Sequence, residues 1–152
     1  MMKAFEVIEK LQGKTLVTAE SITGGGIGAI LTCISGASTV FKGGIICYAN
    51  EVKRGLLGVS KQDLETCGAV SEPVARQMVL GARRTLYADV AISVTGLAGP
   101  DGDAFGHPVG TVFIGYADAN STRVLEFHFD GDREDVRDQT IEAALDLILE
   151  NA

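Results

Sequence analysis

Apolar positions along this chain alternate between short continuous runs and longer stretches with helical spacing. Runs at 15–19, 44–49 and 90–95 predict strands, and the last is apolar almost throughout, as in a strand that is buried on both faces. Spacing of three and four residues predicts helices, which we place at 3–12, at about 26–33, in a short segment after Asn50 as N-cap, at 72–87 after Ser71 as N-cap, and at 133–150. In the first helix, Phe5, Ile8 and Leu11 are expected to face the core.

Two further strands, 110–117 and 122–129, flank the turn residues Asp118-Ala119-Asn120-Ser121 and predict a hairpin. Hairpin strands are antiparallel, whereas the earlier βα units favour parallel strands with right-handed crossovers. The pattern therefore predicts an α/β fold with three α/β/α layers and a mixed, mainly parallel five-stranded sheet whose fourth strand is antiparallel. Because no linker or repeat interrupts it, we expect one domain over 1–152. Strand order cannot be read from the pattern.

Charge and cysteine content restrict the function classes. A net charge of −7 argues against a general nucleic-acid or anionic-membrane surface, although it leaves room for a small basic pocket that holds one phosphate. Three cysteines without C-x-x-C spacing are typical of reduced thiols in a cytosolic protein, and neither a signal-peptide pattern nor an apolar run of membrane-spanning length occurs. We expect a cytoplasmic protein with no nucleic-acid or membrane partner.

The candidate chemistry centres on Ser21, in the stretch Thr18-Ala19-Glu20-Ser21-Ile22-Thr23-Gly24-Gly25-Gly26. A strand delivers this serine to a glycine-rich turn that opens a helix, and ligands of open α/β sheets bind just beyond the carboxyl ends of strands. Free N–H groups and the positive helix end should attract a phosphate or a developing oxyanion. The pattern leaves open whether Ser21 is a nucleophile or a helix cap.

Several familiar motifs are absent. Gly24-x-Gly26-x-x-Ala29 loosely fits a dinucleotide fingerprint, but no acidic residue lies between Ser21 and Asn50 to hold a ribose. There is no Walker A or G-x-S-x-G sequence, and neither His107 nor His128 has neighbours at metal-ligand spacing. We therefore expect no metal site.

Other groups at the same sheet edge could assist Ser21. Lys53, expected in the first turn of the helix after Tyr48, could act as a neutral base directly or through the Tyr48 hydroxyl; the alternative is an exposed lysine. Thr95 precedes a second glycine-rich loop, 96–103, which is either a ligand-binding loop or a plain connection. Arg137, on the inward line of the last helix, and Arg133 could bind phosphate or belong to a surface ion-pair ladder.

Taken together, an ordered set of motifs resembles the C-terminal domain of CinA, the competence/damage-inducible protein family, which includes stand-alone nicotinamide-nucleotide amidases. The matching segments cover nearly the whole chain: Thr18-Ala19-Glu20-Ser21-x-Thr23-Gly24-Gly25, Gly43-Gly44 through Tyr48-Ala49-Asn50-Glu51-x-Lys53, Gly68-Ala69-Val70-Ser71-Glu72, Val94-Thr95-Gly96-Leu97-Ala98-Gly99-Pro100, Pro108-Val109-Gly110-Thr111-Val112 and Gly131-Asp132-Arg133.

The resemblance implies hydrolysis of nicotinamide mononucleotide to nicotinate mononucleotide and ammonia, by a Ser–Lys mechanism that needs no metal or cofactor. It implies Ser21 as nucleophile, Lys53 as base, and Tyr48 and Thr95 as assistants in proton transfer or orientation. Expected substrate-binding residues for this phosphorylated pyridine nucleotide are Thr23, Gly24, Gly25, Gly96, Gly99, Arg133 and Arg137. We also expect a homo-oligomer.

Three segments depart from the family pattern. Ile22 stands where the family usually has Cys, residues 102–107 replace a stretch that usually contains Gly-Gly and a Lys, and Ser35-Gly36-Ala37-Ser38 varies Pro-Gly-Ser-Ser. Two functional classes follow, an amidase or a non-catalytic nucleotide-binding or regulatory module. The presence of Ser21, Tyr48 and Lys53 together favours the amidase.

Overall fold

The structure, a computed structural model, describes residues 1–152 and alternates helices and strands. The elements are, in chain order, α1 (Met2–Lys10), β1 (Leu16–Glu20), α2 (Gly26–Thr32), a short 3₁₀ helix (Ala37–Thr39), β2 (Phe41–Ile46), α3 (Asn50–Leu57), α4 (Lys61–Cys67), α5 (Glu72–Thr85), β3 (Val90–Gly96), β4 (Thr111–Ala117), β5 (Thr122–His128) and α6 (Arg133–Asn151). No helix is both long enough and apolar enough to cross a membrane.

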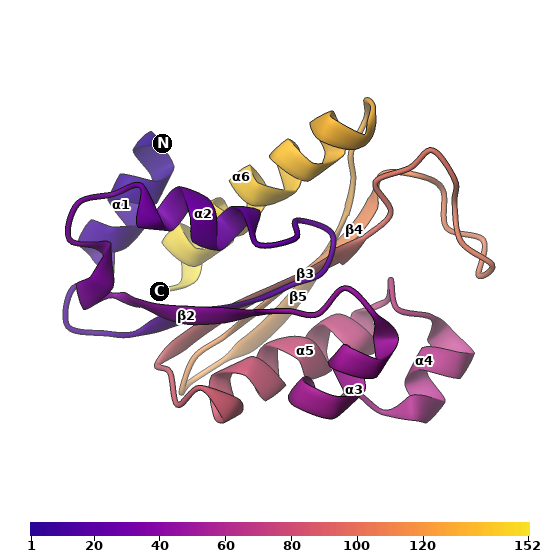
Figure 1. Cartoon of the computed structure of the whole chain (residues 1–152), viewed down its shortest axis with the longest axis horizontal. Helices are drawn as coiled ribbons and strands as arrows, with labels where there is room; N and C mark the ends of the chain where they lie inside the picture. Colours follow the sequence, from indigo (N-terminus) through magenta and orange to yellow (C-terminus); the bar gives the residue numbers. More distant parts are fainter.

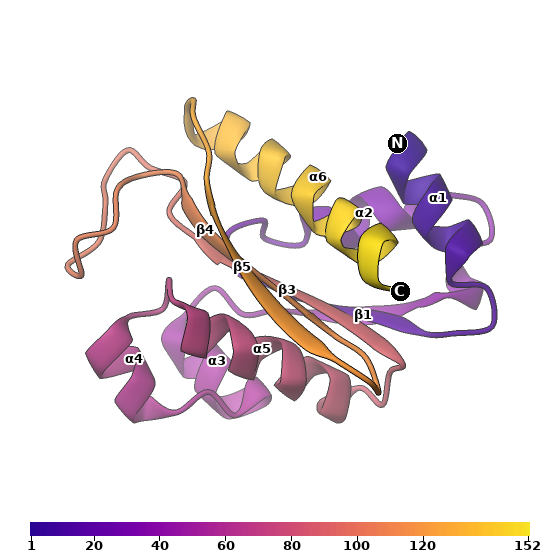
Figure 2. The same ribbon diagram turned by 180° about the vertical axis from the view of Figure 1, so that it is seen from behind.

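The five strands form one sheet in the order β2-β1-β3-β4-β5. β1 pairs in parallel with β2 and β3, whereas β4 is antiparallel to both β3 and β5. Helices α1, α2 and α6 cover one face of the sheet, and α3, α4 and α5 cover the other (Figures 1 and 2). This arrangement confirms the predicted α/β class with an antiparallel fourth strand.

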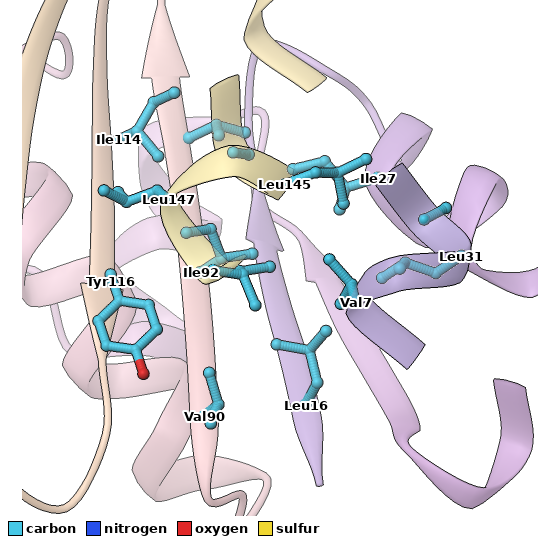
Figure 3. Packing of buried hydrophobic residues seen from close by; sticks show 14 of the residues in the cluster. Val7, Leu16, Ile27, Leu31, Val90, Ile92, Ile114, Tyr116, Leu145 and Leu147 are labelled. Atoms are coloured by element: carbon cyan, nitrogen blue, oxygen red, sulfur yellow. The ribbon is translucent and has the colours of Figure 1, made fainter. Parts of the chain in front are cut away.

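Two apolar clusters hold the layers together. The larger one packs α1, α2 and α6 onto one sheet face, where Leu16, Ile92 and Ile114 of neighbouring strands meet Ile27 of α2 and Leu145 of α6 (Figure 3). A smaller cluster lies under α5 on the opposite face. β3 is buried along nearly its whole length, as its continuous apolar run predicted.

Some element predictions were wrong in detail. β2 begins and ends three residues earlier than predicted, at Phe41 and Ile46, because its pairing with β1 stops at Ile46, opposite Glu20. Tyr48 therefore lies in the connection to α3. Asn50 is the first residue of α3, while Ala49 occupies the N-cap position. Phe5 is 51% exposed, because α1 buries the stripe that contains Ala4 and Ile8 instead.

Helix α4 was not predicted, since it buries only Leu64 and so has little apolar periodicity. Its start is fixed locally by the Ser60 side chain, which accepts a hydrogen bond from the Asp63 N–H (2.9 Å). By contrast, Ser71 stands at the predicted N-cap position of α5, yet its hydroxyl donates backwards to the Gly68 carbonyl (2.8 Å).

The packing of α5 on α3 depends on Gly81, where a β-carbon would collide with the Leu57 carbonyl group. We expect Gly81→Ala to lower the free energy of unfolding by about 1–3 kcal/mol through overpacking. Gly55→Ala is the matched control, because an added β-carbon on this exposed α3 residue meets nothing within 4 Å. Urea denaturation should show Gly55→Ala unchanged or more stable; equal stability of both variants would contradict the close approach.

Candidate active site

A cleft of about 300 Å³ lies at the carboxyl ends of β1 and β3. Its walls come from the turn after β1, the segment between β2 and α3, the loop after β3, and the start of α6. The loop after β3 projects beyond this edge of the sheet (Figure 1). Residues distant in sequence therefore converge here, among them Ser21, Lys53, Thr95 and Arg133.

Ser21 is the first residue beyond β1 and is fixed by its main chain. Its N–H donates to the Val94 carbonyl of β3 (3.0 Å), which continues the parallel β1–β3 pairing by one residue. The residue is 7% exposed and lines the cleft. Ser21 is not the N-cap of α2, because Gly25 occupies that position.

Lys53 lies on the first turn of α3 and is only 1% exposed. Its Nζ lies 3.0 Å from the Ser21 Oγ, 2.8 Å from the Cys47 carbonyl oxygen and 3.1 Å from the Tyr48 carbonyl oxygen. No carboxylate pairs with this amine. Burial lowers the pKa of Lys53 below its ordinary value of 10.5, since removal from water disfavours the charged form.

The three oxygens around Lys53 suit a base. A neutral amine has two N–H donors and one lone pair, so the carbonyls of Cys47 and Tyr48 can accept both donors while the lone pair faces the Ser21 hydroxyl. The charged amine can donate to all three oxygens. The same three oxygens can therefore satisfy the amine in its neutral and in its charged form.

Tyr48 and Thr95 both line the cleft but contact different partners. Tyr48 is 65% exposed, and its hydroxyl accepts from Arg133 Nη2 (3.3 Å) instead of contacting Lys53. Lys53 Nζ thus contacts the Ser21 hydroxyl directly, and the Tyr48 hydroxyl does not bridge the two residues. Thr95 is buried, and its hydroxyl donates to the Ala69 carbonyl (2.8 Å).

The glycine-rich turn is organised by Glu20, a role that the sequence pattern did not predict. The residue is 2% exposed, and its carboxylate accepts from the N–H groups of Ile27 (2.8 Å) and Gly28 (3.0 Å) at the start of α2. The hydroxyls of Thr18 and Thr23 also donate to it (2.9 and 2.7 Å). The helix end expected to attract an anion is therefore already occupied by Glu20.

The expected substrate-binding residues separate into two groups. Gly96, Gly99 and Arg133 line the cleft, whereas Thr23, Gly24, Gly25 and Arg137 do not. The Arg133 guanidinium donates to the Gly99 carbonyl (2.7 Å) as well as to Tyr48. Arg137, on the inward line of α6, instead donates to the carbonyls of Ile22 and Thr23.

Comparisons with known proteins identify the family. A family model described as the CinA C-terminal domain matches residues 2–152. This chain belongs to the CinA C-terminal domain family. Solved structures of similar proteins include the competence/damage inducible protein of Agrobacterium tumefaciens, at 37% identity, a TM-score of 0.94, and coverage of 98% of this chain and 93% of that chain. A CinA superfamily protein of Escherichia coli has 33% identity and a TM-score of 0.96 over 99% of this chain and 88% of that chain.

Relatives known from sequence are longer. A CinA-like protein of Sulfurihydrogenibium is 46% identical over 146 residues, which make up 94% of this chain and 36% of that protein. A CinA-like protein of Gloeothece citriformis is 56% identical over 107 residues, or 70% of this chain and 26% of that protein. The chain therefore spans roughly a third or less of the length of these curated relatives.

The departures from the CinA pattern lie mostly away from the cleft. Residues 102–107 do not line it, and the loop is tied internally by Asp103, whose carboxylate contacts the His107 ring (2.8 Å). The segment 35–38 precedes β2 and so lies at the opposite edge of the sheet. Only Ile22 contributes to the cleft wall.

Other reactive side chains are separate from Ser21. Neither His107 nor His128 lines the cleft; His128 is exposed and pairs with Glu126 (2.7 Å). None of the cysteines is paired, and burial raises the pKa of Cys47 to about 11, so this thiol stays protonated at neutral pH. No group of three or more His, Cys, Asp or Glu side chains is arranged to hold a metal ion.

Proposed function

We propose that this CinA-family chain is a nicotinamide-nucleotide amidohydrolase, which converts nicotinamide mononucleotide to nicotinate mononucleotide and ammonia. The observation that carries the proposal is the 3.0 Å contact between Lys53 Nζ and Ser21 Oγ inside a cleft. A buried amine with a lowered pKa beside a serine hydroxyl is the arrangement that activates a serine without histidine.

The proposed reaction has two halves. The Ser21 oxygen attacks the carboxamide carbon while its proton passes to Lys53, and the tetrahedral intermediate then collapses with transfer of that proton to the departing nitrogen. Ammonia leaves, and an ester joins Ser21 to the nicotinate. Lys53, neutral again, takes a proton from the water that attacks the ester, and it returns this proton to the Ser21 oxygen as the second tetrahedral intermediate collapses and the Ser21 O–C bond breaks. Nicotinate mononucleotide leaves, and its new carboxyl group loses its remaining proton to solvent.

Ammonia release tests the proposal directly. The purified chain should release one ammonia for each nicotinate mononucleotide formed, as measured by a coupled ammonia assay and by chromatography of the nucleotides. A regulatory module of the same fold would bind the nucleotide in calorimetry without forming either product. Binding without turnover would therefore reject the amidase in favour of that module.

Phosphate recognition is assigned to Arg133, since it lines the cleft and only two of its five N–H donors are engaged. We expect Arg133→Ala to weaken the preference for the mononucleotide over its riboside by about ten- to a hundredfold, the value of a charge-assisted contact. The measurement is kcat/KM for both substrates. Arg123→Ala, at the start of β5 and far along the sheet, is the control. An unchanged preference in Arg133→Ala would reject the assignment.

A further inference from the structure

We propose that the main-chain N–H of Ile22 binds the developing oxyanion of the reaction, and that Arg137 positions this donor by holding the turn after Ser21. This inference rests on the proposed amidase function and assigns the group that stabilises negative charge at the same serine. Arg137 does not line the cleft, so it is a positioning residue and not a catalytic one.

The turn after Ser21 leaves two consecutive donors free. The Gly24 N–H donates to the Ser21 carbonyl (3.2 Å), and this bond closes a turn whose two central residues are Ile22 and Thr23. No hydrogen bond within the protein uses the N–H of either central residue. The Ser21 N–H is already engaged by Val94 and the start of α2 by Glu20, so neither can serve.

The place of the Ile22 N–H in the chain suits an oxyanion site. The N–H of the residue that follows a serine nucleophile commonly supplies such a donor, because it lies beside the carbon that the serine attacks. Ile22 is that residue here, and it lines the cleft. Buried main-chain donors are normally satisfied by some partner, and a substrate oxygen can provide one.

Arg137 holds the opposite side of the same turn. Its Nε donates to the Ile22 carbonyl (3.1 Å) and its Nη2 to the Thr23 carbonyl (3.0 Å). These two bonds fix the planar peptide units that follow Ile22, and so restrict the rotation of the Ile22 backbone that would turn its N–H away from the cleft.

Glu20 also holds this turn, through the Thr23 side chain, whose hydroxyl donates to the buried carboxylate (2.7 Å). We call the contacts that Arg137 and Glu20 make with the turn the clamp. Thr23 is therefore held by a carboxylate at its side chain and by a guanidinium at its carbonyl. A turn fixed in this way need not reorganise when negative charge develops, which is the condition for strong transition-state stabilisation.

The test compares the nicotinamide substrate with its thioamide analogue, whose sulfur accepts hydrogen bonds weakly. Arg137→Ala should lower kcat for the amide by about ten- to a hundredfold, somewhat less than the loss of a whole oxyanion donor, with KM changed by no more than about twofold. The loss for the thioamide should be clearly smaller. Arg137→Lys should recover part of the amide rate, and Arg123→Ala should match the wild type. Equal losses for both substrates, or a change in KM alone, would overturn the inference.

A fluorophosphonate probe separates this inference from the substrate assignment. Ser21 should attack its phosphorus, forming the Ser21 O–P bond and releasing fluoride while the proton passes to Lys53; the phosphoryl oxygen then occupies the oxyanion site. Mass spectrometry should show slower labelling of Ser21 in Arg137→Ala than in wild type and in Arg123→Ala. Labelling with this difference, without turnover of the nucleotide, would reject the proposed function and support the clamp. No labelling of wild-type Ser21, or equal rates in all variants, would overturn the clamp.

Discussion

Ser21→Ala is expected to abolish amide hydrolysis, with kcat falling by on the order of 10⁴-fold or more, as when a serine nucleophile is removed elsewhere. The fold should be retained, because the substitution removes one oxygen from a cleft wall and Ser21 is anchored through its main chain. The measurement is ammonia release at saturating nicotinamide mononucleotide, together with thermal unfolding. Ser93→Ala is a matched control, since Ser93 is a buried serine whose hydroxyl bonds to the Ala75 carbonyl of α5.

The two serine variants should behave oppositely. Ser93→Ala should lose some stability and keep its turnover, whereas Ser21→Ala should keep its stability and lose its turnover. A folded Ser21→Ala variant with wild-type kcat would show that a different group attacks the carboxamide.

Lys53→Met is expected to be nearly as inactive, because no other base contacts the Ser21 hydroxyl. The wild type should also show a defined pH dependence. Burial lowers the pKa of Lys53, so the neutral, active amine forms below the ordinary value of 10.5. The rate should therefore rise with pH through the lowered pKa and then level off. The measurement is kcat/KM of the wild type across this range.

Two further lysine variants test whether Lys53 is the base that sets this pH dependence. Lys53→Arg keeps a side chain that stays charged at these pH values, so it should remain inactive at every pH. Lys42→Met removes an exposed lysine whose Nζ contacts the Tyr87 carbonyl, and it should match the wild type in rate and pH profile. A Lys53→Met variant that retains the wild-type pH profile would place the base elsewhere.

The sequence predicted the layers and the mixed sheet well because their signals are local. The continuous apolar run of β3 and the helical stripe of α5 report burial directly. Strand order could not be predicted, since it depends on which edges pair over long distances. The end of β2 was misplaced for the same reason: its limit is set by pairing with β1 and not by its own apolar residues.

For the site, too, some features could be predicted from the sequence and others could not. Ser21, Lys53 and Thr95 each stand at or near the end of a predicted strand, so simple sheet geometry places them at one edge, and the structure brings all three to the cleft. The roles of Glu20 and Arg137 could not be predicted, because side-chain periodicity says nothing about contacts to main-chain groups. The inward line of α6 pointed Arg137 correctly toward the sheet, but its partners are carbonyl oxygens of the turn.

The central claim is that Ser21 becomes acylated, and rapid quenching followed by peptide mass spectrometry tests it most directly. During turnover of nicotinamide mononucleotide, the peptide that contains Ser21 should carry the mass of the substrate less ammonia, and the adduct should be absent from Ser21→Ala. Steady ammonia release with Ser21 unmodified at every quench time would contradict the account.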